Sequence, residues 1–353
     1  MRCAVQCHKE LEIEKIFDNG FSYCEIKLGE NQNIEAGLCG RISGIVISLK
    51  GMTMENLGEA VKQALNVNAE YVCIETLGED DLDALVTAVS CNAELIRAAH
   101  IDIVIENSAS LIDGVYVHNL LSGCRNLLAV TDGLNSIVGT DCFGVCFNVG
   151  YANLLQCNIT EYVKELGTAL KVVHINDNDC RSNQKQMPYT FTYGRGIKLT
   201  EWNKIIGKLM SLQYKGWLVF DNSGTFEKAP KELHEDMLKL MKAICEEWNF
   251  YDTLEEKLST PDKDIILFGA GKMAENYMSV WGKKYPPAFL VDNNKDIWGK
   301  TAFGVPVEGP EKIIEVPVER RNVLICNMHY REIGAQLERM GVQYECYNDE
   351  YFM

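Results

Sequence analysis

The segment Lys171-Val-Val-His-Ile-Asn-Asp-Asn-Asp179 joins a short apolar run to an abrupt polar end. The β-branched residues Val172 and Val173 suit a buried parallel strand. His174 then stands at the carboxyl end of that strand, and Asp177 follows in the next loop. In barrels of alternating strands and helices, this end carries the catalytic residues. The segment therefore predicts a site, with a histidine satisfied by a backbone carbonyl as the alternative.

Seven further apolar runs of similar length occur in the first 250 residues. Together with Leu170–Ile175, the predicted strands are Cys3–Cys7, Tyr23–Leu28, Ile42–Leu49, Tyr71–Thr76, Ile101–Asn107, Phe143–Asn148 and Trp217–Asp221. Helix-like stretches such as Leu82–Ala99 and Leu199–Gln213 lie between them. Eight strand–helix units in about 250 residues are typical of a (β/α)8 TIM barrel. An open doubly wound sheet, which usually has fewer strands for this length, is the alternative.

The composition limits the class of partner. The formal net charge of −16 at pH 7 argues against nucleic acid and anionic membrane surfaces. The fourteen cysteines are scattered and include no Cys-x-x-Cys pair, so their spacing gives no zinc framework, and a reducing compartment fits best. No apolar run has the length of a signal peptide or a membrane span. We expect a cytoplasmic protein with a small-molecule substrate, and a homodimer is one possible assembly.

Four consecutive predicted strands each end in one oxygen or nitrogen donor. These donors are Glu106, Asn148, His174 and Asp221. Two carboxylates, an amide oxygen and an imidazole can hold a divalent metal ion, and the two carboxylates balance its charge. Because polar residues commonly end strands, simple solvation is the alternative.

A polar, proline-bearing segment at 251–262 is the predicted linker between the barrel (1–250) and a second domain (263–353). The second domain opens with a predicted strand, a Gly269-Ala-Gly-Lys-Met-Ala274 turn and a helix. A second predicted strand then ends at Asp292. This order is typical of a small Rossmann-like α/β domain.

The glycine turn has the parts of a cofactor site. Its glycines permit a tight bend and close backbone approach, and the amides at the helix start suit a pyrophosphate. An acid at the end of the next strand suits a ribose. The predicted cofactor-binding residues are Gly269, Gly271, Lys272, Asp292 and Asn293. NAD or another nucleotide is the expected ligand, and a turn kept only as scaffold is the alternative.

Several motifs of the first 250 residues, in their order, resemble the xylose isomerase-like TIM barrels of the sugar phosphate isomerase/epimerase superfamily. They are Gly20–Ile26, Ile103–Asn107, Cys146–Asn153, Val172–Asn178, Gly194–Ile197 and Tyr214–Asp221. The resemblance implies metal-dependent sugar or sugar-phosphate isomerisation or epimerisation through an enediolate. It assigns one Mn²⁺, Zn²⁺ or Mg²⁺ ion to Glu106, Asn148, His174 and Asp221. It also makes Glu106 and Asp221 the catalytic carboxylates, on opposite faces of the enediolate.

The chain departs from the family at three of these positions. Asn148 stands where the family has aspartate, and Tyr151 where it usually has a histidine. Asp221 replaces a glutamate, which retracts the carboxylate by about 1.5 Å, one carbon–carbon bond. Two hypotheses remain open: an isomerase or epimerase with a modified site, and a non-catalytic protein that binds a carbohydrate or nucleotide sugar.

Other polar residues near the same mouth are candidates for substrate binding. They are His8, Tyr151, Asp177, Arg181 and Arg195. Either arginine could bind a phosphate or hydroxyl groups, or could be a solvated loop residue. The remaining histidines in predicted helices or at helix ends are expected to be structural; these are His100, His118 and His234.

The second domain has a resemblance of its own. Its segments 291–300, 304–307 and 310–313 resemble the small Rossmann-like domains of bacterial surface-sugar enzymes, such as the N-terminal domains of nucleotide-sugar acetyltransferases. The resemblance implies a nucleotide sugar as the ligand, with NAD as the alternative. It also suggests a role in surface-polysaccharide metabolism.

Overall fold

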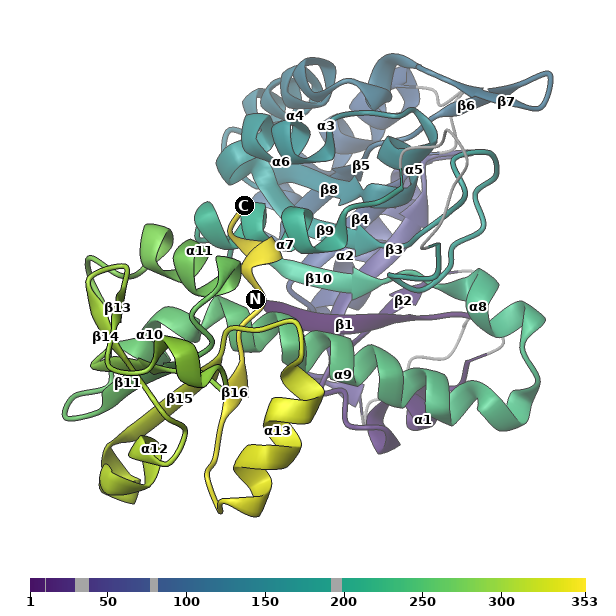
Figure 1. Cartoon of the computed structure of the whole chain (residues 1–353). Coiled ribbons are helices and arrows are strands. Elements are labelled where there is room, and N and C mark those ends of the chain that lie inside the picture. The colour runs from purple at the N-terminus through teal and green to yellow at the C-terminus, as the bar shows by residue number, and fades with distance from the viewer. Residues whose placement is uncertain (10, 29–37, 77–81, 192–198) are drawn as a thin grey trace. The chain divides into compact units, whose positions relative to one another are not determined.

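The computed structural model describes the chain apart from residues 10, 29–37, 77–81 and 192–198 (Figure 1). It divides into two compact units, Met1–Trp248 and Asn249–Met353. All fourteen cysteines are free thiols. Among the described residues, no helix is both long and apolar enough to cross a lipid bilayer.

The first unit is a closed barrel of eight parallel strands, as the sequence predicts. In chain order the strands are β1 (Arg2–Cys7), β2 (Cys24–Lys27), β3 (Ile42–Ser48), β4 (Tyr71–Glu75), β5 (Asp102–Glu106), β8 (Phe143–Asn148), β9 (Leu170–Ile175) and β10 (Trp217–Phe220). Each pairs with the next around the ring, and β10 closes it against β1. Two irregularities in register occur, at Cys24/Glu25 and at Val145/Cys146.

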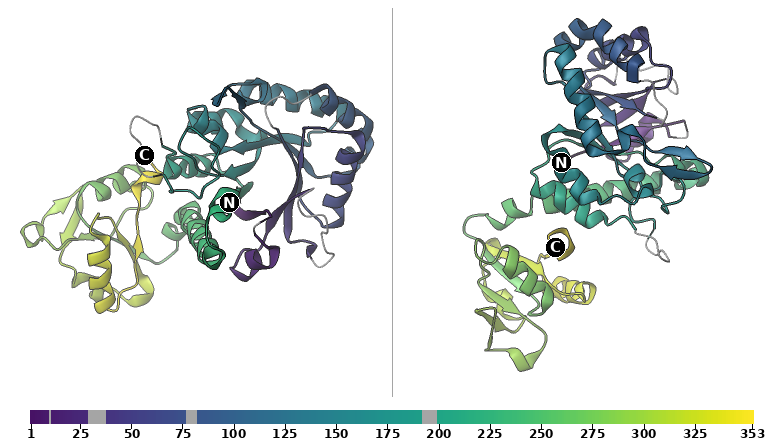
Figure 2. Two further views of the ribbon diagram at one scale, coloured as in Figure 1. Left: turned by 90° about the vertical axis from the view of Figure 1, so that its right-hand side faces the viewer. Right: turned by 90° about the horizontal axis from the view of Figure 1, so that it is seen from above.

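Helices follow the strands and surround the barrel (Figures 1 and 2). They are α1 (Ile13–Asp18), α2 (Met54–Asn66), α3 (Leu82–Ala99), α4 (Cys124–Val138), α5 (Val149–Leu154), α6 (Ile159–Leu166), α7 (Trp202–Ser211), α8 (Ser223–Lys228) and α9 (His234–Asp252). Short 3-10 turns lie at Leu120–Ser122, Gly167–Ala169 and Lys231–Leu233. A small antiparallel hairpin of β6 (Ser110–Ile112) and β7 (Val115–Val117) follows β5 and extends away from the barrel (Figure 1).

The barrel interior is filled by side chains, because alternate residues of every strand point inward. This interior cluster consists of Ala4, Val46, Tyr71, Cys73, Val104, Cys146, Val172, Trp217 and Val219, all at most 2% exposed. The long apolar runs read from the sequence are explained by burial on both faces, since the outward residues lie beneath helices.

Gly44 on β3 leaves the space that the Tyr71 ring occupies. A Cβ atom at position 44 would lie 2.1 Å from Tyr71 Cε2. We expect Gly44→Ala to lower the free energy of unfolding by about 1–3 kcal/mol, because the ring must move within a filled interior. Urea denaturation followed by circular dichroism measures this loss.

Gly133→Ala is the matched control for Gly44→Ala. Gly133 lies inside α4, and a Cβ atom there would meet nothing within 4 Å. It should stabilise the chain by about 0.5–1 kcal/mol through helix propensity. A Gly44→Ala protein as stable as the wild type would show that the Tyr71 ring is not fixed in this space.

The second unit is built on a six-stranded sheet in the order β13-β14-β12-β11-β15-β16. Its strands are β11 (Asp264–Phe268), β12 (Phe289–Val291), β13 (Thr301–Ala302), β14 (Val305–Glu308), β15 (Arg321–Ile325) and β16 (Glu345–Cys346). Its helices are α10 (Leu254–Leu258), α11 (Lys272–Val280), α12 (Lys312–Glu315) and α13 (Tyr330–Arg339), with 3-10 turns at Lys295–Ile297, Val318–Arg320 and Asp349–Tyr351. The sheet is mixed, because β13 pairs antiparallel with β14 while the other pairs are parallel. A Rossmann-like identity for this unit stays a prediction. The segment predicted as a linker, 251–262, carries the end of α9 and all of α10.

Candidate functional site

The carboxyl ends of the barrel strands bring polar side chains to one mouth. A residue two positions after an inward-facing one also points inward, because side chains alternate along a strand. Interior positions are held by Val104, Cys146, Val172 and Val219. Two positions further along the chain stand Glu106, Asn148, His174 and Asp221, each only 1% exposed. Local strand periodicity therefore places all four predicted residues at this mouth.

His174 lies between two buried carboxylates. Its Nδ1 is 2.7 Å from Glu106 Oε1, and its Nε2 is 3.1 Å from Glu25 Oε1. Burial opposes a charge on the ring, but the charge of Glu25 and the hydrogen bonds to both carboxylates outweigh it. The pKa of His174 is therefore raised well above its usual value. The arrangement fits an imidazolium that donates one N–H to each carboxylate.

Glu25 on β2 belongs to this site, although the sequence analysis does not select it. Its Oε2 accepts a hydrogen bond from Gln6 Nε2 at 2.6 Å, and its Oε1 accepts one from the Tyr71 hydroxyl at 2.7 Å. Burial would raise the pKa of Glu25, but the charge of His174 and these hydrogen bonds hold it below its usual value. Glu25 could have been found from the sequence because it is an acid inside the apolar strand Tyr23–Leu28. An unpaired buried charge is costly, so an acid in such a strand indicates a buried partner.

The two carboxyl oxygens of Glu106 differ in their hydrogen bonding. Its Oε1 accepts hydrogen bonds from His174 and from Asn148 Nδ2, the latter at 2.9 Å. Its Oε2 is buried and has no hydrogen-bond partner among the described residues. Burial raises the pKa of Glu106, and the hydrogen bond and charge of His174 offset only part of that effect. Glu106 is thus better suited to carry a proton than Glu25, whose pKa is lowered.

The Asn148 amide oxygen is engaged in hydrogen bonds within the protein. Asn148 is the N-cap of α5, and its Oδ1 accepts a hydrogen bond from Tyr151 N at 3.2 Å. The same oxygen accepts a second hydrogen bond, from Asn176 Nδ2 at 3.1 Å. Both contacts direct the amide oxygen toward the helix start, so it is not presented to the mouth of the barrel.

A buried lysine pairs with Asp221. The Lys185 ammonium is 2.8 Å from Asp221 Oδ2 and 3.8 Å from Glu75 Oε1. Glu75 also pairs with Lys27, whose ammonium is 2.5 Å from Oε2. Burial would raise the pKa of Asp221, but the charges of Lys185 and His174 outweigh it and lower that pKa. Asp221 is therefore an ionised carboxylate, and its Oδ1 has no hydrogen-bond partner in the described chain.

Lys27 and Lys185 belong to this group of paired charges, although neither is among the site residues predicted from the sequence. Lys185 lies in the loop after β9, where no local pattern distinguishes it from a solvated residue. With His174 protonated, the two lysines and the imidazolium face four carboxylates, those of Glu25, Glu75, Glu106 and Asp221. Among the residues that the structure describes at the mouth, these three positive charges nearly balance the four carboxylates.

Two of the four residues predicted as metal ligands keep a carboxylate oxygen with no hydrogen-bond partner in the described chain, Glu106 Oε2 and Asp221 Oδ1, but the other donors of the set are engaged. Both ring nitrogens of His174 contact carboxylates, and the Asn148 oxygen accepts two hydrogen bonds. The Lys185 ammonium neutralises Asp221. A divalent ion at about 4 Å from an ammonium would be repelled by several kcal/mol at an effective dielectric constant of about 20. In this arrangement the donor set does not fit a divalent metal ion.

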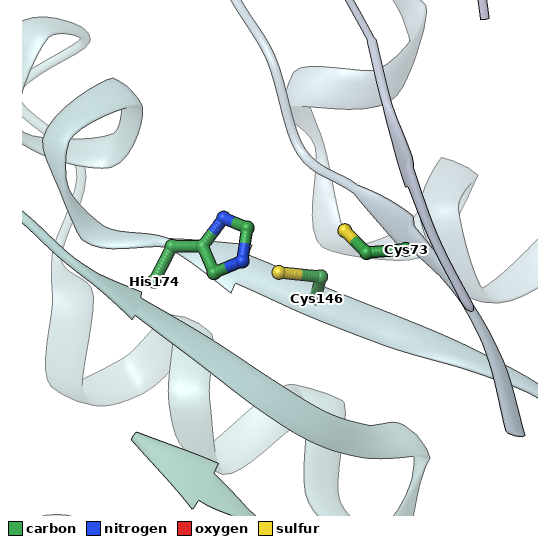
Figure 3. Close-up of side chains that lie close together, drawn as sticks. All are labelled: Cys73, Cys146 and His174. Atoms are coloured by element: carbon green, nitrogen blue, oxygen red, sulfur yellow. The ribbon is translucent and has the colours of Figure 1, made fainter. Parts of the chain in front are cut away.

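A second group of possible metal ligands lies around His174. Cys73 on β4, Cys146 on β8 and His174 have potential ligand atoms that all lie within 4.8 Å of one another (Figure 3). Two thiolates and an imidazole would suit a soft ion such as Zn²⁺. Burial raises the pKa of both thiols, that of Cys146 well above its usual value, so binding would have to displace two protons inside the core.

The other predicted substrate-binding residues occupy different surroundings. Asp177 accepts hydrogen bonds from Thr200 Oγ1 at 2.9 Å and Trp202 Nε1 at 3.2 Å, which tie it to the start of α7. His8 is buried with its ring centroid 5.3 Å from that of Phe226. The remaining three are Tyr151, which is buried at the start of α5, Arg181, which is exposed, and Arg195, which lies outside the described residues.

The three histidines expected to be structural have different surroundings. His234 is buried, with Nε2 3.1 Å from the Phe226 carbonyl oxygen, and His118 Nδ1 is 3.2 Å from Ser122 Oγ. His100 is exposed and adopts a positive φ of 52°. None of these contacts involves the residues of the barrel mouth.

An acidic side chain accepts a hydrogen bond from the glycine turn of the second unit. Asp292 Oδ2 accepts a hydrogen bond from Ala270 N at 3.1 Å, and Gly269 adopts a φ of 120°. Lys272 is paired with Glu275 at 2.8 Å. Asn293 exchanges two side-chain hydrogen bonds with Gln336. An anion approaching this turn would find the Ala270 amide already used by a carboxylate.

Comparison with known proteins bears on the barrel. No protein-family model and no curated protein matches the sequence. The structure of an L-ribulose 3-epimerase matches this chain with 14% sequence identity and a TM-score of 0.54. The match covers 74% of this chain and 99% of the epimerase chain. A D-allulose 3-epimerase from Methylomonas sp. has 14% identity and a TM-score of 0.51, covering 70% and 98%. A D-psicose 3-epimerase has 13% identity and a TM-score of 0.50, covering 69% and 98%. At these identities the likeness establishes the fold: the first unit is a TIM barrel of the kind on which these sugar epimerases are built.

Proposed function

We propose that the barrel isomerises or epimerises a sugar or sugar phosphate through an enediolate. The observation that supports this most directly is the pair Glu106 and Asp221. Their pKa values are shifted in opposite directions, and each keeps one buried oxygen without a hydrogen-bond partner among the described residues. Carboxylates with diverging pKa values at one site are the usual basis for separate acid and base roles.

The position of the two carboxylates suits proton transfer on two sides of a substrate. Glu106 ends β5 and Asp221 follows β10, and β8 and β9 lie between these strands in the barrel. The ionised Asp221 would take a proton from the carbon next to a carbonyl group, and the resulting negative charge would reside on the enediolate oxygens. For an epimerase, Glu106 would return a proton to the opposite face of the same carbon. For an isomerase, it would return a proton to the neighbouring carbon while the hydroxyl proton passes from one enediolate oxygen to the other.

Three solved structures that resemble the barrel bear the names of sugar 3-epimerases, which supports this class of reaction. The metal-dependent form predicted from the sequence is not retained, because the lone pairs of His174 and Asn148 are engaged and Asp221 is neutralised. The sugar could belong to surface-polysaccharide metabolism, as the resemblance of the second unit suggests.

A hydrogen-exchange screen tests the proposed reaction. Ketoses, aldoses and their phosphates would be incubated with the protein in D2O and followed by proton NMR. The expected result is loss of the C–H signal next to the carbonyl of at least one sugar, together with appearance of its isomer or epimer. Absence of exchange in pentoses, hexoses and their phosphates, under conditions in which the protein is folded, would contradict the proposal.

A non-catalytic carbohydrate-binding protein is the second candidate. The ion pair between Asp221 and Lys185 favours it, because a carboxylate held by an ammonium at 2.8 Å is a weaker base. Saturation-transfer NMR on the same sugars separates the two candidates. Binding without exchange would identify a binding protein.

For the second unit, we keep nucleotide or nucleotide-sugar binding as a hypothesis. Trp298 lies next to the predicted site, since its Nε1 donates a hydrogen bond to the Asp292 carbonyl oxygen at 2.7 Å. Titration with UDP-glucose or NAD should therefore change the tryptophan fluorescence. An unchanged signal with both ligands, together with no heat of binding in calorimetry, would leave the turn as scaffold.

A further inference from the structure

Lys185 supplies one of the positive charges at the barrel mouth, the one paired with Asp221. Its side chain is 20% exposed, whereas the side chain of its partner Asp221 is 2% exposed. Asp221 takes one of the three N–H bonds of the ammonium, and Glu75 Oε1 at 3.8 Å is beyond hydrogen-bond distance. As far as the described residues go, N–H bonds remain for an oxygen atom that enters from the mouth.

The backbone conformation at Lys185 is unusual for a side chain of this kind. Its φ is +46°, in the left-handed region that favours glycine. The next residue forms an isolated bridge with Asp177: Asp177 N donates to Gln186 O at 2.8 Å, and Gln186 N donates to Asp177 O at 2.9 Å. Strained residues persist only where their surroundings fix them, and they concentrate at functional sites.

Further contacts fix the loop that carries Lys185. Asn222 Nδ2 donates to Gln186 O at 2.8 Å, and Met187 N donates to Thr225 Oγ1 at 3.0 Å. Gly224 also approaches closely, since a Cβ atom there would lie 1.9 Å from Gln184 O. The loop is thus held against the residues that follow β10, which places the ammonium beside Asp221.

We infer that the Lys185 ammonium provides the positive charge that a divalent metal ion would otherwise provide in this barrel. The ligand class is the carbonyl or enediolate oxygen of a sugar, and this assignment of a ligand rests on the proposed function. The charge arrangement itself does not rest on that function, because it follows from the distances between the Lys185 ammonium and the carboxylates of Asp221 and Glu75.

The ammonium would act by hydrogen bonding and charge. Burial alone would lower the pKa of Lys185, but the charges of Asp221, Glu75 and Glu106 raise it above its ordinary value. The amine therefore stays protonated, and a protonated amine cannot add to a carbonyl group. Negative charge that develops on a substrate oxygen would be stabilised by an N–H donor already in place.

Manganese binding tests the inference without knowledge of the substrate. Mn²⁺ is the appropriate probe because it prefers carboxylates, whereas Zn²⁺ would also be drawn to Cys73 and Cys146. We expect Lys185→Met to bind Mn²⁺ at least about tenfold more tightly than the wild type in calorimetry, since the competing ammonium is gone. Mn²⁺ should also raise the melting temperature of Lys185→Met and leave that of the wild type unchanged.

Two variants control for loss of charge and loss of folding. Lys27→Met removes an ammonium from the same acidic cluster but leaves Lys185 on Asp221, so its Mn²⁺ affinity should stay close to that of the wild type. Lys185→Met/Asp221→Asn removes both members of the pair and should bind Mn²⁺ more weakly than Lys185→Met. If Lys185→Met folds only in the presence of Mn²⁺, the ion has replaced the ammonium, as inferred.

The inference is overturned if the wild type binds one Mn²⁺ as tightly as Lys185→Met does. It is also overturned if Mn²⁺ neither binds nor stabilises Lys185→Met. Both results test the charge at the mouth and do not test the proposed function. The proposed function fails if no sugar exchanges a C–H proton in the NMR screen in D2O.

Discussion

Replacing Glu106 by glutamine should reduce sugar proton exchange by about 10²–10⁴-fold, the usual contribution of a positioned acid or base. A glutamine side chain keeps an oxygen that can accept the hydrogen bonds of His174 and Asn148, which contact Glu106 Oε1 at 2.7 and 2.9 Å. It cannot carry and release the proton. The expected outcome is a folded protein that binds the sugar and exchanges its C–H proton very slowly, measured by NMR in D2O.

Glu59→Gln is the control for Glu106→Gln. Glu59 is an exposed residue of α2, so Glu59→Gln makes the same chemical substitution on the outside of the barrel. Its exchange rate should equal that of the wild type. A Glu106→Gln protein that exchanges protons within about tenfold of the wild-type rate would remove Glu106 from the acid–base pair.

Trp248→Ala should lower the free energy of unfolding of the barrel by about 3–5 kcal/mol, as is usual for a buried tryptophan. Trp248 on α9 is 0% exposed, and its ring stacks on that of Phe220 with centroids 5.8 Å apart and an interplanar angle of 5°. It also stacks on Trp202 at 6.2 Å, and its Nε1 donates to the Tyr189 hydroxyl at 3.0 Å. The substitution therefore leaves a large cavity among β10, α7 and α9.

Urea denaturation followed by far-ultraviolet circular dichroism measures this effect. Leu240→Ala is the control, because Leu240 lies on the same helix but is 51% exposed, and its loss should change stability by less than about 0.5 kcal/mol. Equal stabilities of Trp248→Ala and Leu240→Ala would show that the stacked rings do not hold α9 to the barrel.

Residues near one another in the sequence determined the strands of the barrel. Each strand is a short apolar run buried on both faces, so its pattern is complete within a few residues. The alternation of side chains then fixes which residue at each strand end faces inward, and Glu106 and His174 follow from Val104 and Val172 by counting two positions. The second unit was less predictable, because its short strands admit more than one arrangement and one edge pair is antiparallel.

The sequence by itself determined the eight strands and the polar residues that end four of those strands, and it favoured a closed parallel barrel over an open sheet. Only the tertiary structure decided what these residues contact: Glu25 reaches His174 from a strand 149 positions away in the chain, and Lys185 reaches Asp221 from a loop. The physical reason is that a strand is encoded by local periodicity and burial. The partner of a buried charge depends instead on the register of distant strands and on how a loop returns to the barrel, and these are fixed only when the whole barrel closes.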